Sequence, residues 1–246
     1  MRASTAKLAG KHILVTRPVA QARPLCAMIR DRGGVALEYP LLEIVPVTSS
    51  RTLDSIAAQL DSYAILIFIS RNAVQYGLPW FGEPMDTARH SLFAVGRSTA
   101  RALQQAGFDE VLYPGGGADS ETLLQLPELA ADRIDGTGVL IIRGRGGREL
   151  LAQTLRERGA VITYAEVYER VQPCYDLEHE TEFWRQHSPD IVILTSCEAV
   201  NNLLQRVPDE FQDKLRNTNT VVMSRRIADY LTAHGFRRPP AVIRQS

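Results

Sequence analysis

An internal repeat constrains the fold of this chain more than any other feature of its sequence. Segments of the two halves match at an offset of 126 residues, and one further region matches at an offset of 128. Residues 66–70 match residues 192–196, and residues 29–35 match residues 155–161. Matches that stay in register across four segments are typical of a duplication. The sequence therefore predicts two structurally similar parts.

Each half of the sequence predicts alternating strands and helices. Residues 65–69 form an uninterrupted apolar run, which is typical of a strand buried on both faces. Ser70 follows that run and fits the N-cap of a helix. A helix is expected at residues 21–32, where a glycine pair ends it, and another at 100–105, after a tight turn over residues 96–99. Alternation of this kind predicts parallel sheets that are covered by helices on both faces.

Two extended segments, residues 38–47 and 164–173, interrupt the alternation at corresponding places in the two halves. Both contain proline and alternate polar with apolar residues. Such segments suit a pair of strands that cross between two domains. The sequence therefore places a hinge within them.

Composition and charge exclude several classes of protein. The chain has 28 basic and 28 acidic residues, so it lacks the basic excess typical of a protein that binds nucleic acid. Three cysteines, without the spacing of metal ligands, favour a reducing compartment over a disulfide or metal site. No apolar run is long enough to cross a bilayer, and residues 1–10 do not resemble a signal peptide. We expect a cytoplasmic protein that binds no membrane and no metal.

The loops that follow the predicted strands are rich in hydroxyl residues, glycine and arginine. In a parallel sheet these loops face the ligand crevice, and free N–H groups at helix N-termini attract anions. Arginine adds charge and a planar pair of donors. For any single loop, the alternative is that the hydroxyl only caps a helix. The sequence as a whole predicts a cleft for a large polyanion, built from Thr16, Arg17, Ser70, Arg71, Gly96, Arg97, Ser98, Thr99, Arg143, Gly144, Arg148, Thr195, Ser196, Ser224, Arg225 and Arg226.

Classical catalytic groups are scarce in this sequence. The five histidines lie outside the strand-end loops, and Glu149 stands where a dinucleotide-binding loop would need glycine. Tyr168 remains, within the second hinge segment. A phenol is protonated at neutral pH and can give a proton to a leaving group. The alternative is a strand tyrosine that only packs against neighbours such as Tyr164.

The order and spacing of five motifs resemble the uroporphyrinogen-III synthase family, over roughly residues 11–240. The motifs are Val-Thr-Arg-Pro at 15–18, Ile-Ser-Arg-Asn-Ala-Val at 69–74, Ala-Val-Gly-Arg-Ser-Thr-Ala at 94–100, Arg-Gly-Arg-Gly-Gly-Arg-Glu-Leu-Leu at 143–151 and Val-Tyr-Glu at 167–169. One departure lies in the last strand–helix loop, where Ile227 stands at a position that often carries a hydroxyl. The contacts expected from that loop then fall to Arg225 or Arg226.

The resemblance implies an α/β fold of two parallel-sheet domains joined by a two-stranded antiparallel linker. Domain one would hold residues 1–37 and 174–246, domain two residues 48–163, and the linker residues 38–47 and 164–173. Each domain would then combine pieces of both repeats.

The resemblance also implies a reaction. The family closes the linear tetrapyrrole hydroxymethylbilane, with loss of water and inversion of the last ring, to give uroporphyrinogen III in tetrapyrrole and haem biosynthesis. It is a lyase reaction that uses no metal and no organic cofactor. The eight carboxylates of the substrate suit the arginine-rich loops, and Tyr168 aligns with the family's candidate proton donor to the departing hydroxyl.

Two other functions compete with this interpretation. A non-catalytic, hinge-bending binding protein for a polyanionic metabolite would also need two lobes and an arginine-rich cleft. A DNA-linked regulator is disfavoured by the zero net charge. We expect a monomer, since two cores account for the apolar residues, with at most transient contact with the preceding enzyme of the pathway.

Overall fold

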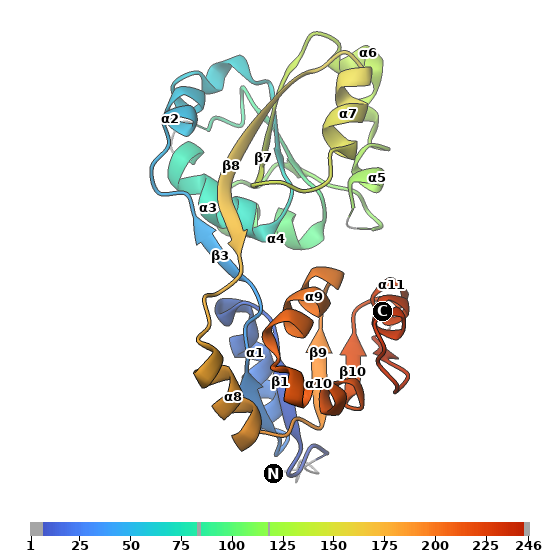
Figure 1. The fold of residues 1–246 in the computed structure, drawn as a ribbon. Helices are drawn as coiled ribbons and strands as arrows, with labels where there is room; N and C mark the ends of the chain where they lie inside the picture. Colours follow the sequence, from blue (N-terminus) through green and yellow to red (C-terminus); the bar gives the residue numbers. More distant parts are fainter. Residues whose placement is uncertain (1–6, 83–84, 118, 244–246) are drawn as a thin grey trace, which may run out of the picture. The chain divides into compact units, whose positions relative to one another are not determined.

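The computed structural model describes residues 7–82, 85–117 and 119–243. The chain divides into two compact units. Unit 1 comprises residues 1–44 and 171–246, and unit 2 comprises residues 45–170. Each unit is built on one sheet with helices around it, as Figure 1 shows. The predicted α/β class with parallel sheets is confirmed.

The sheet of unit 1 has five strands in the order β11-β10-β9-β1-β2. All four pairings between these strands are parallel. The strands are β1 (His12–Val15), β2 (Val35–Glu38), β9 (Ile191–Leu194), β10 (Asn219–Val222) and β11 (Ala241–Val242). The helices are α1 (Val19–Arg30), α8 (Leu177–Gln186), α9 (Cys197–Arg206), α10 (Asp209–Arg216) and α11 (Arg225–Ala233).

Alternation along β1 gives unit 1 a core on each face of its sheet. Leu14 joins the larger cluster, with residues of β9 and of helices α8 to α11. Ile13 and Val15 point the other way and pack with Ala22, Cys26 and other residues of α1. Successive side chains of a strand point to opposite faces, so a strand that is apolar throughout can fill both cores.

The sheet of unit 2 has six strands in the order β3-β8-β7-β4-β5-β6. The strands are β3 (Glu43–Pro46), β4 (Ile65–Phe68), β5 (Ser91–Ala94), β6 (Val111–Leu112), β7 (Gly138–Gly144) and β8 (Val161–Val171). The helices are α2 (Arg51–Ala58), α3 (Arg71–Phe81), α4 (Arg97–Gln105), α5 (Ser120–Leu123), α6 (Ala131–Ile134) and α7 (Leu150–Glu157), with 3-10 turns at Leu60–Ser62 and Pro127–Leu129.

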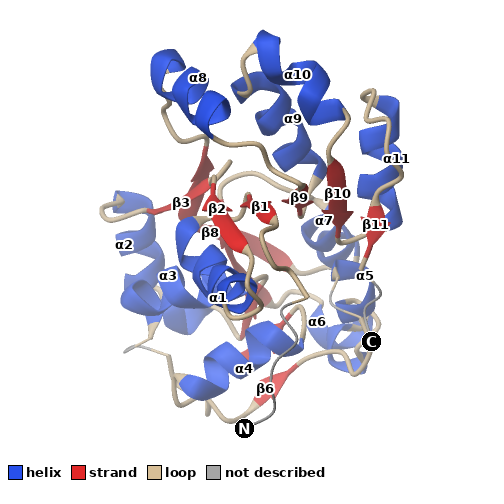
Figure 2. Ribbon diagram, turned by 90° about the horizontal axis from the view of Figure 1, so that it is seen from below, coloured by secondary structure: helices blue, strands red, loops and turns tan. Residues whose placement is uncertain are grey.

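Helices cover both faces of the unit 2 sheet. All four residues of β4 are buried, as its apolar run predicted. Ile65 and Ile67 pack in one cluster with residues of α5, α6 and α7. Figure 1 shows α2 and α3 on one side of this sheet and α5, α6 and α7 on the other, and Figure 2 gives a view turned by 90°.

Strands whose sequences correspond in the repeat occupy equivalent positions in the two sheets. At an offset of 126 residues, β1, β2 and β9 of unit 1 correspond to β7, β8 and β4 of unit 2. The run β9-β1-β2 in one sheet therefore mirrors β4-β7-β8 in the other. Each sheet takes strands from both halves of the sequence. The duplication and the predicted linker between the units stay predictions.

Three helix boundaries differ from the prediction. Helix α4 begins at Arg97, because Gly96 takes the extended N-cap conformation and residues 97–99 already form the first turn. The expected start at residue 100 was wrong. Helix α1 begins at Val19, not at residue 21, and ends at Arg30, not at residue 32. Gly33 follows with φ of +80°, a left-handed conformation that favours glycine beyond a helix end.

Candidate functional site

The candidate residues of unit 2 lie at the carboxyl ends of its strands. Ser70 and Arg71 follow β4, Gly96 follows β5, and Gly144 ends β7. These three strands are parallel neighbours, so their ends share one edge of the sheet. Tyr168 pairs with Gly144 near the end of β8 and joins the same edge. This is the edge at which parallel α/β sheets bind ligands.

Tyr168 lies in a seat formed by three other residues. Its side chain is fully buried. The ring centroid lies 5.9 Å from that of Tyr76, on α3. The ring also lies against Gly144, where an added Cβ atom would come 2.6 Å from Cζ of Tyr168. The phenolic oxygen lies 3.2 Å from Oγ of Ser70.

A β-bulge turns Tyr168 into this seat. Arg143 of β7 pairs with Glu166, but the next residue, Gly144, pairs with Tyr168, so Val167 is an extra residue in β8. An extra residue disrupts alternation and redirects the side chains that follow it. Val167 and Tyr168, although adjacent, are therefore both fully buried.

Ser70 both caps a helix and meets the phenol. It holds the N-cap position of α3 in extended conformation, and its Oγ accepts a hydrogen bond from the N–H of Ala73 at 3.1 Å. This confirms the predicted cap. Ser70 is half-buried, whereas Tyr168 is buried completely. The same hydroxyl thus contacts both the helix terminus and the phenol, and it belongs to a partly exposed residue.

Arg143 makes several contacts within its own loop. Its side chain is buried, and Nη1 donates to Oε1 of Glu149 at 3.0 Å. Nε donates to the carbonyl of Gly144 at 3.3 Å, and Nη2 donates to the carbonyl of Gly146. The guanidinium also lies over the ring of Tyr164. Through these bonds Arg143 holds the loop after β7. Its predicted contact with an anion stays a prediction.

Contacts in the loop after β7 shift the pKa values of Glu149 and Tyr164. The hydrogen bond from the Tyr164 hydroxyl, together with the bond and charge of Arg143, lowers the pKa of Glu149 below its ordinary value. Burial, and then the bond to Glu149, raises the pKa of Tyr164. The carboxylate is thus held charged and the phenol neutral, which keeps the loop in one arrangement near neutral pH.

The other three candidate arginines of unit 2 are exposed. Arg71 and Arg97 open helices α3 and α4, and neither lies within 4.0 Å of a carboxylate of the residues that the structure describes. Arg148 is exposed and lies 3.9 Å from Glu121. Beside these residues, Ser98 is exposed, while Gly96 and Thr99 are buried. Exposed arginines without a carboxylate partner are free to bind a ligand anion.

The candidates of unit 1 lie at the carboxyl ends of β1, β9 and β10. Ser196 caps α9 and accepts from the N–H of Ala199 at 3.1 Å. Thr16 is buried, and its hydroxyl donates to the carbonyl of Ile193 at 2.6 Å, which ties β1 to β9. Arg17 places Nη2 3.9 Å from the sulfur of Met223. The other members of this group are Thr195, which follows β9, Ser224, which holds the N-cap position of α11 without a capping bond, Arg225, which pairs with Asp229 at 3.1 Å, and the exposed Arg226.

Comparison with known proteins gives the family of the chain. The family model described as uroporphyrinogen-III synthase HemD matches residues 24–241. The chain belongs to the uroporphyrinogen-III synthase family. The resemblance seen in the sequence motifs is therefore confirmed.

Individual uroporphyrinogen-III synthases are similar along nearly the whole chain. The enzyme of Escherichia coli K12 is 36% identical over 229 residues, which is 92% of each chain. That of Salmonella typhimurium LT2 is 35% identical over the same share. The fold is also similar to crystal structures from Thermus thermophilus (TM-score 0.62, 18% identity, 96% of this chain and 94% of that one) and Helicobacter pylori 26695 (TM-score 0.59, 18% identity, 96% and 93%).

A polar cluster in unit 1 of this synthase-family chain has no signal in the sequence. Arg206 of α9 lies between the rings of Tyr39 and Tyr175, 3.6 Å and 2.8 Å from their centroids. It donates to Oε1 of Glu180 at 2.6 Å and to the carbonyl of Pro40 at 2.8 Å. These partners lie 26 to 167 residues away from Arg206 along the chain, so no local pattern marks them.

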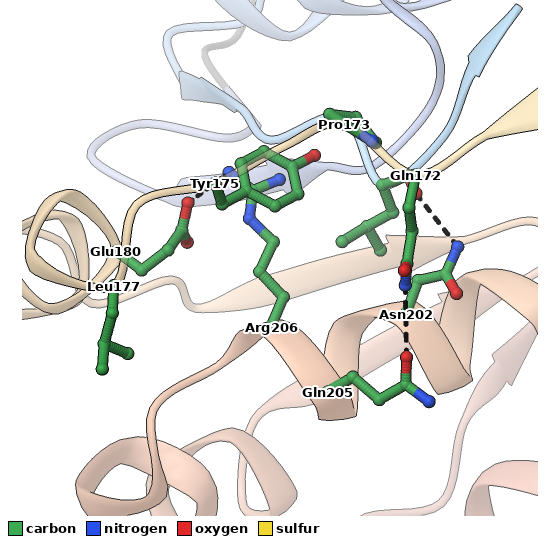
Figure 3. Close-up of a pocket in the computed structure, with 9 residues that line it drawn as sticks. Gln172, Pro173, Tyr175, Leu177, Glu180, Asn202, Gln205 and Arg206 are labelled. Atoms are coloured by element: carbon green, nitrogen blue, oxygen red, sulfur yellow. Dashed lines mark hydrogen bonds and ion pairs between the residues drawn. The ribbon is translucent and has the colours of Figure 1, made fainter.

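The cluster borders a cavity of about 240 Å³, drawn in Figure 3. Gln172 bonds to Gln205 across this cavity, and Asn202 donates to the carbonyl of Leu41. Burial raises the pKa of Tyr175 to about 12. The charges of Arg206 and Glu180 are paired with each other. The bonds of the cluster hold residues 39–41 and 172–175 against α8 and α9.

Two kinds of site are absent from the described residues, a metal centre and a membrane-spanning helix. Within the described ranges, no group of three or more histidine, cysteine, aspartate or glutamate residues could hold a metal ion. In the same residues, no helix combines the length and apolar character needed to cross a membrane.

Proposed function

We infer that this chain catalyses the reaction of its family, the cyclisation of hydroxymethylbilane to uroporphyrinogen III. Water is lost and the last ring is inverted, a lyase reaction in tetrapyrrole and haem biosynthesis. The observation that carries this inference is the family match over residues 24–241, supported by relatives that align over 92% of the chain. The alternative of a non-catalytic binding protein is not favoured.

Tyr168 is the source of the proton for the departing hydroxyl. The C–O bond breaks, its electron pair leaves with the oxygen, and the phenolic proton turns that oxygen into water. The seat of Tyr168 supports this role, because Gly144 and Tyr76 fix the ring and the hydroxyl meets Ser70. A general acid contributes about 10²–10⁴-fold to a rate, so the remaining catalysis comes from holding the flexible bilane in one geometry.

The exposed arginines at the strand ends bind the carboxylates of the substrate. Arg71 and Arg97 in unit 2 and Arg226 in unit 1 support this, since no described carboxylate lies within 4.0 Å of them. A hydrogen bond to a charged group contributes about 1.5–3 kcal/mol. The N–H groups at the starts of α3, α4, α9 and α11 add further donors, beside the hydroxyls of Ser98, Thr195, Ser196 and Ser224.

The chain works as a monomer in the cytoplasm, with residues 38–47 and 164–173 linking its two domains. Each unit has its own buried core, which supports a chain that folds as two units of its own. Cys26, Cys174 and Cys197 are free thiols, which suits a reducing compartment. Any contact with the preceding enzyme is transient.

The test of this function compares the chain with its Tyr168→Phe variant on freshly prepared hydroxymethylbilane. The wild-type chain is expected to form isomer III, and the variant to form it about 10²–10⁴-fold more slowly at unchanged substrate affinity. Equal rates for the two proteins would remove Tyr168 from the mechanism. Formation of isomer I alone by both, with tight binding, would favour the binding protein.

A further inference from the structure

We propose that Ser70 is a catalytic residue, which relays the proton of Tyr168 to the departing hydroxyl of the substrate. The proposal rests on the proposed function, because it takes the phenol as the proton source. It differs in the group that touches the substrate. That group is the half-buried Ser70, 3.2 Å from the phenolic oxygen, and not the fully buried Tyr168.

The hydrogen-bond capacity of the two hydroxyls leads to this arrangement. A buried phenol needs an acceptor for its proton, and Ser70 Oγ is the partner that the Tyr168 hydroxyl has among the described residues. A serine hydroxyl has two acceptor sites and one donor. The N–H of Ala73 occupies one acceptor site at 3.1 Å. With the buried phenol as the donor of the 3.2 Å contact, Tyr168 occupies the other acceptor site. The proton of Ser70 is then left for a third group, outside the seat.

The repeat shows that the fold does not need this pair. Ser196 is the counterpart of Ser70 at an offset of 126 residues, and it caps α9 through the same bond, at the same 3.1 Å. At the same offset, Leu42 stands in place of Tyr168 and Pro18 in place of Gly144. Unit 1 thus keeps the helix cap, with neither a tyrosine nor a glycine at the positions that match Tyr168 and Gly144. The seat of Tyr168 is an addition to unit 2, which is where a specific chemical role would be expected.

The relay balances as one concerted step. The substrate C–O bond breaks with its electron pair on the oxygen, and that oxygen takes the proton of Ser70 and leaves as water. Ser70 takes the proton of Tyr168 at the same time, so neither a free alkoxide nor a doubly protonated serine forms. The phenolate that remains regains a proton when the closing pyrrole ring loses one at the carbon that forms the new bond.

Two nearly isosteric variants separate the relay from helix capping. Ser70→Thr keeps a hydroxyl at the N-cap, whereas Ser70→Val has a similar shape, cannot pass a proton and leaves little space for a water molecule. We expect Ser70→Val to slow isomer III formation by about 10²-fold or more, and Ser70→Thr to stay nearer to wild type. Ser50→Val is the matched control, because Ser50 caps α2 in the same unit, accepting from Leu53, and among the described residues its hydroxyl has no hydrogen bond to a tyrosine. It should keep the wild-type rate.

A double-mutant cycle and a proton inventory decide between the outcomes. If Ser70 acts through Tyr168, Ser70→Val adds no further loss to Tyr168→Phe. In mixtures of H₂O and D₂O, the single-turnover rate should then follow a quadratic curve in the deuterium fraction, because two protons move in one step. A linear inventory, or fully additive losses, would overturn the relay and leave the proposed function standing. A wild-type rate in Tyr168→Phe would instead count against the proton source itself.

Discussion

Replacing Gly144 with alanine tests the seat of Tyr168 directly. The new Cβ atom would come 2.6 Å from Cζ and 2.9 Å from Cδ2 of the ring, closer than carbon atoms approach without displacement. Gly144 is not among the glycines with positive φ, so the collision, not backbone strain, sets the cost. Overpacking costs about 1–3 kcal/mol. The lower entropy of the unfolded alanine chain offsets about 0.4–1 kcal/mol of this.

The net loss should therefore be about 1–2 kcal/mol in the free energy of unfolding. At about 2–4 °C per kcal/mol for a chain of this size, Tm falls by about 2–8 °C. The rate of isomer III formation should fall further than stability alone explains, because a catalytic group displaced by about 1 Å can cost about 10²-fold. Urea unfolding and single-turnover kinetics measure the two losses separately.

Gly115→Ala is the control for this experiment. Gly115 has no positive φ, and an added Cβ atom there would meet nothing within 4 Å. It should keep both stability and rate. In a Tyr168→Ala background, Gly144→Ala should cost little, because the ring that it strikes is gone. Wild-type behaviour of Gly144→Ala, or the same cost with and without the ring, would refute the reasoning.

Three further predictions concern binding, stability and pH. Arg97→Gln should raise the KM for hydroxymethylbilane and change kcat less. Arg133→Gln, in the short helix α6, is the control and should change neither. Steady-state kinetics that give the same KM and kcat for both variants would contradict this. Arg206→Met leaves the buried Glu180 unpaired and should cost about 3–5 kcal/mol in urea unfolding, so a loss below about 1 kcal/mol would show that the pair is not buried in solution. The pKa of Tyr175 is raised to about 12 in the folded chain, so the unfolded chain loses its proton first. Its contribution to stability is full below about pH 10 and is lost as the pH rises towards 12. Burial also raises the pKa of Tyr39 and of Tyr164, so unfolding curves of Tyr175→Phe across that range should show a smaller loss than wild type.

Local features of the site could be predicted from the sequence because local rules govern them. Ser70 follows an apolar strand and precedes a helix, and both the cap and its position at the strand end came out as expected. The parallel sheets likewise follow from the alternation of strands and helices. Strands that match at an offset of 126 residues stand in the same order in the two sheets.

Long-range features of the site could not be predicted in this way. Ser70 and Tyr168 are 98 residues apart, and the bulge that turns the tyrosine towards α3 lacks any glycine in β8 to mark it. Arg143 is predicted to bind an anion because it opens a glycine-rich loop. The partners that engage it, Glu149 and the carbonyls of Gly144 and Gly146, depend on how that loop closes.

The ratio of product isomers tests the central claim most directly. Hydroxymethylbilane is allowed to react with and without the wild-type chain, the products are oxidised, and isomers I and III are separated. Spontaneous closure gives isomer I without inversion. The reaction with the chain should give mainly isomer III, at a rate proportional to protein concentration. Isomer I alone, from folded protein that binds the bilane, would contradict the account.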